Sequence, residues 1–194
     1  MSETKCIMIV GVGGQGTLLA SRILGNVLLS LGHDVKLSEV HGMSQRGGSV
    51  VTYVKYGDKV FSPVVDKGEA DFILSFERLE AARWLSYLNQ GGKLIVNDQR
   101  INPMPVITGA AQYPDAIIEK IKDKGADMLP VDALSLALEA GSSKAVNVVL
   151  IGILASMMDL SLDVWQKALA STVPSKFLEM NKKAFDLGYK AGKK

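Results

Sequence analysis

The sequence predicts a Rossmann-like α/β fold, in which a mostly parallel sheet is flanked by helices and followed by a helical C-terminal subregion. Three observations predict it. Short apolar runs alternate with stretches of helical periodicity through residues 1–143. A glycine-rich turn joins the first apolar run to the first helical stretch. From residue 144 onward, only helical patterns remain. We therefore expect a single domain over residues 1–194, with a sheet part at 1–143 and a helical part at 144–194.

The first unit is a strand, a turn, a helix and a second strand. Residues 5–10 form a nearly continuous apolar run, which is typical of a strand buried on both faces. Residues 17–31 carry apolar side chains at helical spacing, and Gly32 fits the position after a helix end. Residues 34–40 are predicted as strand two, reached by a right-handed crossover.

The rest of the sheet part is less regular. The β-branched residues 48–55 predict a strand, and residues 59–61 are compatible with a short antiparallel return. The proline-rich residues 102–105 are predicted as a loop or an edge segment. Patterns of buried strands and of helices alternate over the remainder: strands at 70–76, 93–97 and 128–131, and helices at 77–88, 114–124 and 133–140.

The helical part is predicted as three successive helices, at residues 144–158, 162–170 and 176–190. Ser161 and Ser175 are plausible N-caps, because serine oxygens accept hydrogen bonds from free backbone N–H groups. Asn147 is a polar residue within the first, apolar helix. It is either a capping or helix–helix hydrogen-bonding residue, or a member of the functional site.

Composition and charge exclude several classes of protein. The chain has 194 residues, of which 47% are hydrophobic and 22% charged, as in folded rather than disordered proteins. Its net charge of +2 is too small to imply a nucleic-acid or membrane partner. The longest apolar stretch, residues 145–158, is shorter than the ~20 residues of a membrane span. No signal-peptide pattern precedes the first strand. We therefore expect a cytoplasmic protein.

Cysteine and histidine are too scarce for a metal centre. The chain has one cysteine, Cys6, and two histidines, His33 and His41. One thiol forms no internal disulfide and does not ligate an iron–sulfur cluster, which needs about four thiolates. A zinc site with four nitrogen or sulfur ligands is likewise excluded, and we assign no metal ligand to this chain. We expect Cys6 to be a small buried residue.

The first candidate segment is the glycine-rich turn at residues 11–16. Its glycines have the G-x-G-x-x-G spacing between a strand and a helix, where free N–H groups favour an anion. A nicotinamide site also needs an acidic residue about 20 residues further on. The nearest, Glu39, comes late, and Gln15 is bulky for such a turn. A dinucleotide site, a tight turn without a nucleotide, and a site for another anion or a partner all remain open. The candidate residues are Gly11, Gly13, Gly14, Gln15, Gly16 and Thr17.

The second candidate segment, Glu-Val-His-Gly-Met-Ser-Gln-Arg-Gly-Gly, ends at Gly48 and has a composition that no core element favours. His41 is able to exchange protons near neutral pH, unless its own loop binds it. Arg46 is able to clamp a carboxylate or phosphate, unless it forms an internal salt bridge. Because each segment follows a predicted strand of one parallel sheet, we expect the two to lie close together. The candidates are His41, Met43, Ser44, Gln45, Arg46, Gly47 and Gly48.

A catalytic centre is not evident in the sequence. No serine–histidine–acid arrangement or paired-carboxylate site stands out, and Glu77 and Glu80 are interpreted as solvated helix ends. We therefore assign no catalytic residue to this chain.

Four segments together resemble the small subunit of 2-oxoacid:ferredoxin oxidoreductases over nearly the whole chain. They are the turn at 11–16, the segment at 39–49, Ser62-Pro63, and Lys-Ala-Val-Asn-Val-Val-Leu-Ile-Gly at 144–152. The turn is common to that family. The His-Gly-Met-Ser-Gln-Arg-Gly-Gly loop is similar to the branch that acts on indolepyruvate.

The resemblance implies a division of labour between two subunits. In this family a thiamine diphosphate attacks the 2-oxoacid, carbon dioxide leaves, electrons pass through [4Fe–4S] clusters to ferredoxin, and coenzyme A takes the acyl group. The thiamine and the clusters belong to the large alpha subunit, so this chain is expected to bind no cofactor tightly. Its loops would face the active-site region and coenzyme A at the interface. There, Arg46 and the amides of residues 13–17 would contact anions, and Met43 and His41 would line the interface.

The resemblance therefore favours a subunit that is inactive alone and acts on aryl pyruvates when complexed. One alternative is a free-standing nicotinamide- or flavin-dependent oxidoreductase that uses the turn at 11–16. Another is a regulatory protein that binds an anionic metabolite. A subunit without its partner would expose an apolar face, which leaves self-association open, through the loop at Met43 or the helix near Met157 and Met158.

Overall fold

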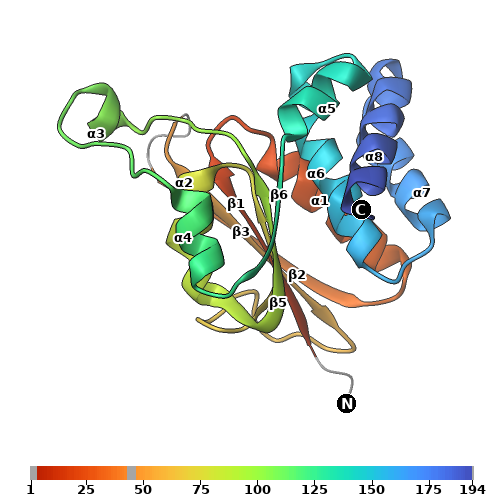
Figure 1. Cartoon of the computed structure of the whole chain (residues 1–194). Coiled ribbons are helices and arrows are strands. Elements are labelled where there is room, and N and C mark those ends of the chain that lie inside the picture. The colour runs from red at the N-terminus through yellow and green to blue at the C-terminus, as the bar shows by residue number, and fades with distance from the viewer. Residues whose placement is uncertain (1–3, 43–46, 194) are drawn as a thin grey trace.

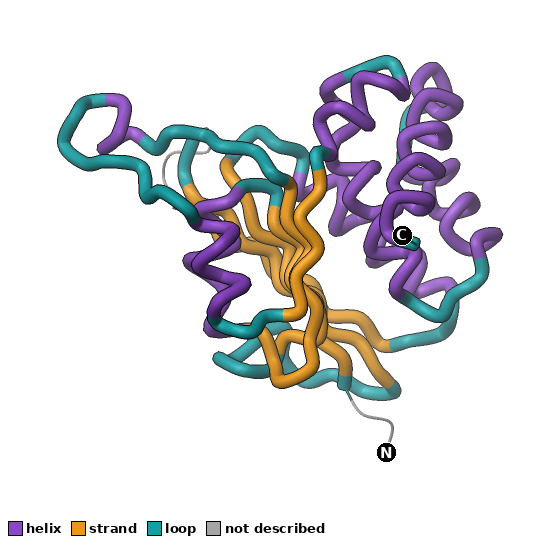
Figure 2. Tube along the Cα trace, in the orientation of Figure 1, coloured by secondary structure: helices purple, strands orange, loops and turns teal. Residues whose placement is uncertain are grey.

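The computed structural model describes residues 4–42 and 47–193. It contains a sheet of six strands between two layers of helices (Figures 1 and 2). The strand order across the sheet is β2-β3-β1-β4-β5-β6. The strands are β1 (Lys5–Val12), β2 (Asp34–His41), β3 (Ser49–Gly57), β4 (Ala70–Ser75), β5 (Leu88–Asn97) and β6 (Asp127–Val131).

The sheet is mostly parallel, but β3 runs against the rest. Strands β1, β4, β5 and β6 pair in parallel, whereas β3 pairs antiparallel with both β1 and β2. We expected the first two strands to lie in one parallel sheet. Strands β1 and β2 do run in the same direction, but β3 lies between them. The burial of the two strands agrees with this order. Most residues of β3 are buried, which suits a strand paired on both sides, whereas no residue of β2 is buried, which suits an edge.

The helices form the two outer layers. Figure 1 shows α2 (Arg78–Trp84) and α4 (Ile117–Asp123) on one side of the sheet, and α1 (Thr17–Ser30) with the C-terminal helices on the other. A large apolar core joins residues of β1, α1 and those helices, which supports our proposal of a single domain. The remaining helical elements are α3 (Met104–Ile107), α5 (Ala133–Ala140), α6 (Val146–Met157), α7 (Leu162–Thr172), α8 (Leu178–Gly192) and the 3-10 turns Leu85–Tyr87, Ser143–Ala145 and Ser175–Phe177.

Helices α6 and α8 pack unusually close together. All but two residues of α6 are buried, so it is a core helix and not an amphipathic one. A side chain at Gly188 would overlap the backbone carbonyl of Val149, and one at Gly152 would overlap the carbonyl of Phe185. The glycines therefore allow the two backbones to touch.

Two local expectations were wrong. Residues 59–61 form no strand; Val60 is buried in a loop that is held to β2, because its N–H donates to Asp34 Oδ2 at 2.8 Å. Ser175 begins a 3-10 turn instead of capping α8. Ser161 is the N-cap residue of α7, as predicted, but its side chain makes no capping hydrogen bond.

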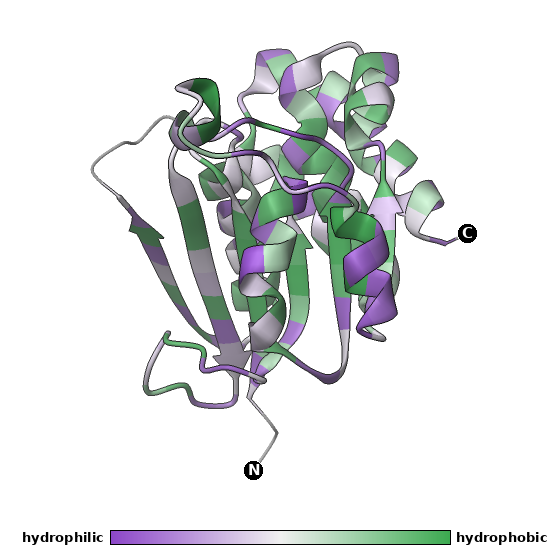
Figure 3. Cartoon of the chain, turned by 60° about the vertical axis from the view of Figure 1, so that its left-hand side comes forward, coloured by the Kyte–Doolittle hydropathy of each residue, from purple (hydrophilic) through white to green (hydrophobic). Residues whose placement is uncertain are grey.

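Residues 101–113 form a projection, which we call the arm. The arm leaves the end of β5, carries the four-residue helix α3, and returns to α4 (Figure 1). Figure 3 shows apolar residues concentrated along the strands, as expected for a sheet covered on both faces. No helix within the described residues is both long enough and apolar enough to cross a membrane.

Candidate functional site

The glycine-rich turn joins β1 to α1 and depends on its glycines. Gly14 and Gly16 have positive φ angles of 102° and 82°, which side-chain-bearing residues rarely adopt. Gly16 is also the N-cap of α1, and a Cβ there would lie 2.6 Å from Nδ2 of Asn147. A Cβ at Gly11 would press on Gln15 and Phe76, 3.0 Å from an atom of each. Glycine is therefore favoured at positions 11, 14 and 16, and no side chain caps the N-terminus of α1 at Gly16.

Gln15 holds the turn in place. Its Oε1 accepts a hydrogen bond from the N–H of Val12 at 2.8 Å, and its Nε2 donates to the carbonyl of Phe76 at 2.9 Å. The side chain therefore ties the turn to the ends of β1 and β4. The side-chain amide of Gln15, which is bulky for a dinucleotide-binding turn, therefore has a structural role.

The second segment meets the first, as predicted. The N–H of Gly13 donates to the carbonyl of Gly48 at 2.8 Å, and the N–H of Gly47 donates to the carbonyl of Gly13 at 3.2 Å. The route differs from the expected one, because the contact comes through β3, the direct neighbour of β1. Residues Met43, Ser44, Gln45 and Arg46 lie outside the described residues.

His41 and Glu39 lie at the end of β2. His41 is exposed, and its Nδ1 lies 3.2 Å from the carbonyl of Gly42, in its own loop. Oε2 of Glu39 accepts a hydrogen bond of 3.5 Å from Thr52 on β3. Both residues line a cavity of about 470 Å³ whose other wall is Gly13, Gly14, Gly16, Thr17, Leu18 and Val50.

Asn147 connects α6 to the turn. It is 3% exposed; its Nδ2 donates to the carbonyl of Gly16 at 3.2 Å, and its Oδ1 accepts from the N–H of Val148 at 2.9 Å. The sequence left open whether Asn147 makes a structural hydrogen bond or belongs to the functional site. The structure shows a hydrogen bond between α6 and the glycine-rich turn. Asn147 thus fixes the start of α1 against the helical part.

A second cavity of about 470 Å³ lies on the other side of the turn. The turn, the residues after β5 and the starts of α5 and α6 surround it. Lys144 is exposed at its rim, so a cation and the N-terminus of α1 face the same space. The arrangement suits an anionic group. The lining residues are Gly14, Gln15, Gly16, Gln99, Ile101, Leu134, Ser143, Lys144 and Val146.

The sequence interpretation of Glu77 and Glu80 as solvated was wrong. Glu77 is 1% exposed and Glu80 is 3% exposed. Glu80 accepts hydrogen bonds from Ser49 Oγ at 2.5 Å and from Arg83 Nη1 at 3.1 Å. Both carboxylates line a third cavity, of about 360 Å³, between the arm and Gly47-Gly48. Burial raises the pKa of Glu80 above its usual value, against the opposing effects of Ser49 and Arg83.

The raised pKa of Glu80 predicts a pH effect on stability. From pH 4.5 up to the higher pKa of the folded state, the folded protein holds a proton that the unfolded chain releases. Stability therefore falls as pH rises through this range. A Glu80→Gln variant has no carboxyl group to titrate at this position. We therefore expect its unfolding free energy to rise relative to that of the wild type between pH 4.5 and pH 7.

Urea unfolding at several pH values measures this difference. Glu179→Gln is the control, because the Glu179 side chain is 84% exposed and pairs with Lys182 at the surface, so its effect is expected to be small at every pH. A stability difference for Glu80→Gln that does not change with pH would contradict the prediction.

Metal binding has no support among the described residues, since no three His, Cys, Asp or Glu side chains there lie close enough to hold an ion. Cys6 is buried, and burial raises the pKa of its thiol to about 11. A thiol in that state is unreactive at neutral pH.

The geometry weighs against a dinucleotide site. In such sites the acidic residue that binds the ribose follows the strand next to the glycine turn. Here β3 separates β2 from β1, so Glu39 lies two strand spacings, about 10 Å, from β1. Glu39 also accepts a hydrogen bond from Thr52 on β3.

Comparisons with known proteins agree with the fold and with the family that the sequence resembles. The profile of a family described as "Pyruvate ferredoxin/flavodoxin oxidoreductase" matches residues 6–191. The "Indolepyruvate oxidoreductase subunit IorB" of Pyrococcus horikoshii is 45% identical, over 96% of this chain and 95% of its own length.

Two solved structures share the fold. Pyruvate oxidoreductase subunit PORC of Thermotoga maritima superposes with a TM-score of 0.75, at 21% identity, over 97% of each chain. The 2-oxoglutarate:ferredoxin oxidoreductase of Magnetococcus marinus gives a TM-score of 0.74 at 17% identity. That match covers the whole of this chain but only 32% of the other. The same fold thus occurs both as a separate chain and as part of a longer one.

Proposed function

The chain belongs to the pyruvate ferredoxin/flavodoxin oxidoreductase family as a small subunit, and we propose that its complex decarboxylates indolepyruvate and other aryl pyruvates oxidatively. The products are the aryl-acetyl-CoA, carbon dioxide and reduced ferredoxin. The observation that carries this proposal is the 45% identity to the P. horikoshii subunit over nearly the full length of both chains. We propose that the complex is cytoplasmic.

The large alpha subunit is proposed to hold the reactive groups. Thiamine diphosphate supplies the carbanion chemistry and [4Fe–4S] clusters carry the electrons. This chain offers one buried cysteine, which is too few thiolates for a cluster. We propose that this chain binds no cofactor tightly and that it contributes to the active-site region of the complex at the interface between subunits.

The glycine-rich turn is the proposed anion contact of this chain. The amides of Gly13 and Gln15 already donate to the carbonyls of Gly48 and Val12, so the proposed contacts are the amides of Gly14, Gly16 and Thr17. They lie at the N-terminus of α1, where the helix dipole favours negative charge, and Lys144 lines the adjoining cavity. Coenzyme A carries a diphosphate of matching charge. We propose that its phosphates approach this turn at the interface between subunits, and that Arg46 also contacts an anion there while His41 and Met43 contribute to the interface.

Reconstitution tests the function. The purified chain alone is expected to decarboxylate nothing. Mixed with the large subunit, it should restore reduction of a viologen dye that depends on both indolepyruvate and coenzyme A. Tight nicotinamide or flavin binding to the isolated chain, measured by calorimetry, would instead favour a free-standing oxidoreductase. Full activity of the large subunit alone would favour a regulatory protein that binds an anionic metabolite.

Arg46 is the side chain with the strongest predicted effect on turnover. In the assembled complex, Arg46→Ala is expected to lower turnover at least about tenfold, the cost of losing one charged hydrogen bond to an anion. Steady-state assays with varied coenzyme A measure the effect. Arg22→Ala is the control, since Arg22 is an exposed arginine of α1 away from both segments. Wild-type turnover with unchanged assembly and unchanged coenzyme A affinity would contradict the active-site role.

A further inference from the structure

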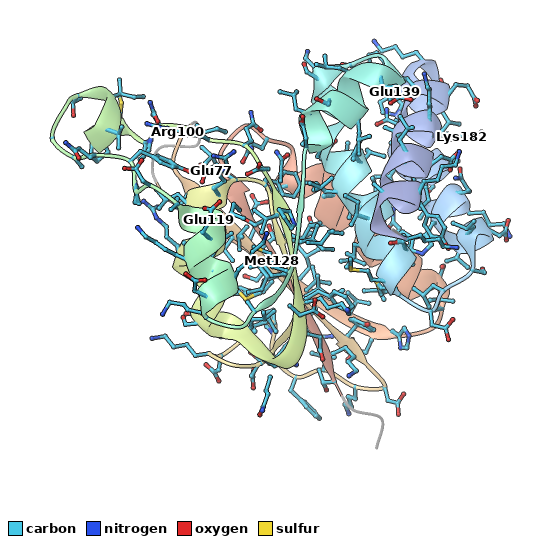
Figure 4. All side chains as sticks on the ribbon, in the orientation of Figure 1. Glu77, Arg100, Glu119, Met128, Glu139 and Lys182 are labelled. Atoms are coloured by element: carbon cyan, nitrogen blue, oxygen red, sulfur yellow. The ribbon has the colours of Figure 1, made fainter. Side chains whose placement is uncertain are left out.

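The arm at residues 101–113 is closed at its base by one buried carboxylate. Oε1 of Glu77 accepts a hydrogen bond from the N–H of Ile101 at 3.1 Å and another from the hydroxyl of Tyr113. The guanidinium of Arg100 lies over the Tyr113 ring, 4.4 Å from its centroid. Figure 4 shows Glu77 and Arg100 at this base. The arm is therefore an Ω-type loop whose two ends are held together.

The arm also holds its own shape. The N–H groups of Val106 and Ile107 donate to the carbonyl of Pro103, at 2.9 and 3.1 Å. The N–H of Thr108 donates to the carbonyl of Met104, and that of Ala111 to the carbonyl of Pro105. With these backbone groups satisfied inside the loop, the arm presents its side chains in a fixed arrangement. Such preorganisation lowers the entropic cost of binding.

The composition of the arm is that of an interface and not of a solvated loop. Its sequence, Ile-Asn-Pro-Met-Pro-Val-Ile-Thr-Gly-Ala-Ala-Gln-Tyr, contains no charged residue, although 22% of the chain is charged. Met104 is 68% exposed and Ile107 is 66% exposed. The centres of protein interfaces are depleted of charge and enriched in methionine. An apolar tip on a rigid projection matches that description.

The arm adjoins the candidate site. Met104, Pro105 and Ile107 form one wall of the 360 Å³ cavity, and Gly47 and Gly48 lie in the opposite wall. A protein that covers the tip of the arm therefore also approaches the glycine-rich turn, to which Gly47 and Gly48 are hydrogen-bonded. The proposed large subunit has to reach the same edge to bring its active site near this turn.

We infer that the arm is the surface through which this chain docks on the large subunit, with Met104 and Ile107 entering an uncharged apolar groove of that subunit. The inference rests on the proposed function, which supplies the partner. It is supported by the uncharged composition and exposed apolar tip of the arm and by the cavity that the arm shares with Gly47 and Gly48 beside the glycine-rich turn. A second copy of this chain is the competing occupant, and the test separates the two.

The test measures binding of the full-length chain to the separately purified large subunit by biolayer interferometry. The variant is Met104→Asp/Ile107→Asp, which places two charges on the tip. Its matched control is Phe61→Asp/Val64→Asp, which changes two exposed apolar residues, 85% and 55% exposed, in the loop after β3. Thermal unfolding of each isolated variant should match the wild type, because all four side chains are exposed.

We expect the arm variant to bind at least about thirtyfold more weakly, as for loss of an interface hot spot. The control should bind within about twofold of the wild type. Unchanged binding by the arm variant overturns the inference and leaves the proposed function intact. Loss of self-association of the isolated chain with unchanged binding to the large subunit assigns the arm to a second copy, and also overturns it. Failure of the wild type to bind the large subunit overturns the proposed function, and the inference with it.

Discussion

A Gly188→Ala variant is expected to lose about 3 kcal/mol of unfolding free energy, at the upper end of overpacking effects. The new methyl group would overlap the backbone carbonyl of Val149, and a backbone carbonyl has no rotamer by which to move aside. Helices α6 and α8 would have to separate. Because α6 is buried on nearly all sides, that movement disturbs the main core.

The matched control is Gly25→Ala on α1. The nearest atom to a Cβ there is Cδ1 of Leu37, at 3.9 Å, so the methyl group fits. We expect a gain of up to about 1 kcal/mol, from the better helix propensity of alanine. Urea unfolding followed by far-ultraviolet circular dichroism measures both variants. Wild-type stability in Gly188→Ala would show that the backbones of α6 and α8 are not in contact.

A Glu77→Ala variant is expected to lose about 3 kcal/mol or more, because several buried donors lose their acceptor at once. The carboxylate accepts from the N–H groups of Leu79 and Glu80, where it caps α2, and from Ile101 and Tyr113 at the base of the arm. An alanine would leave all four without this partner. Glu77→Gln keeps one amide oxygen as an acceptor, so it should lose less.

Thermal and urea unfolding, together with hydrogen exchange of the arm, measure this effect. Glu179→Ala is the control, since Glu179 pairs with Lys182 on the surface and its loss is expected to cost no more than about 1 kcal/mol. A Glu77→Ala variant no less stable than this control would mean that water replaces the carboxylate at no cost. It would also show that the arm does not depend on Glu77.

The parts of the fold that follow local patterns could be predicted from the sequence. The apolar run before the glycine turn, the amphipathic α1 and the apolar α6 each have their own periodicity, and each element is present in the structure. The place of β3 between β1 and β2 could not be predicted in this way. Strand order depends on pairing between distant residues, and the sequence pattern of a buried strand does not name its neighbours.

For the candidate site, the sequence indicated where the glycine-rich turn lies but not which side chains hold it. Glycine spacing correctly indicated the turn, and the turn does meet the loop ending at Gly48, although through β3 and not through the neighbouring parallel strand that we expected. The sequence did not indicate that Gln15 and Asn147 hold this turn in place, because their partners are a distant carbonyl of Phe76 and the carbonyl of Gly16. Glu77 and Glu80 were misjudged because their partners include residues far away in the sequence: Ile101 and Tyr113 of the arm for Glu77, and Ser49 on β3 for Glu80. One visible signal was overlooked: the uncharged run at 101–113.

The antiparallel β3 also bears on how such proteins diversify. Strands β2 and β3 form a hairpin whose register is fixed from Asp34 opposite Gly57 to His41 opposite Val50. The two ends of the connection between these strands, at His41 and Ser49, are therefore fixed, and doubling the length of a chain connection costs only about 0.6 kcal/mol of entropy. The sheet thus tolerates changes in the length and sequence of this connection while the pairing of β2 with β3 stays the same.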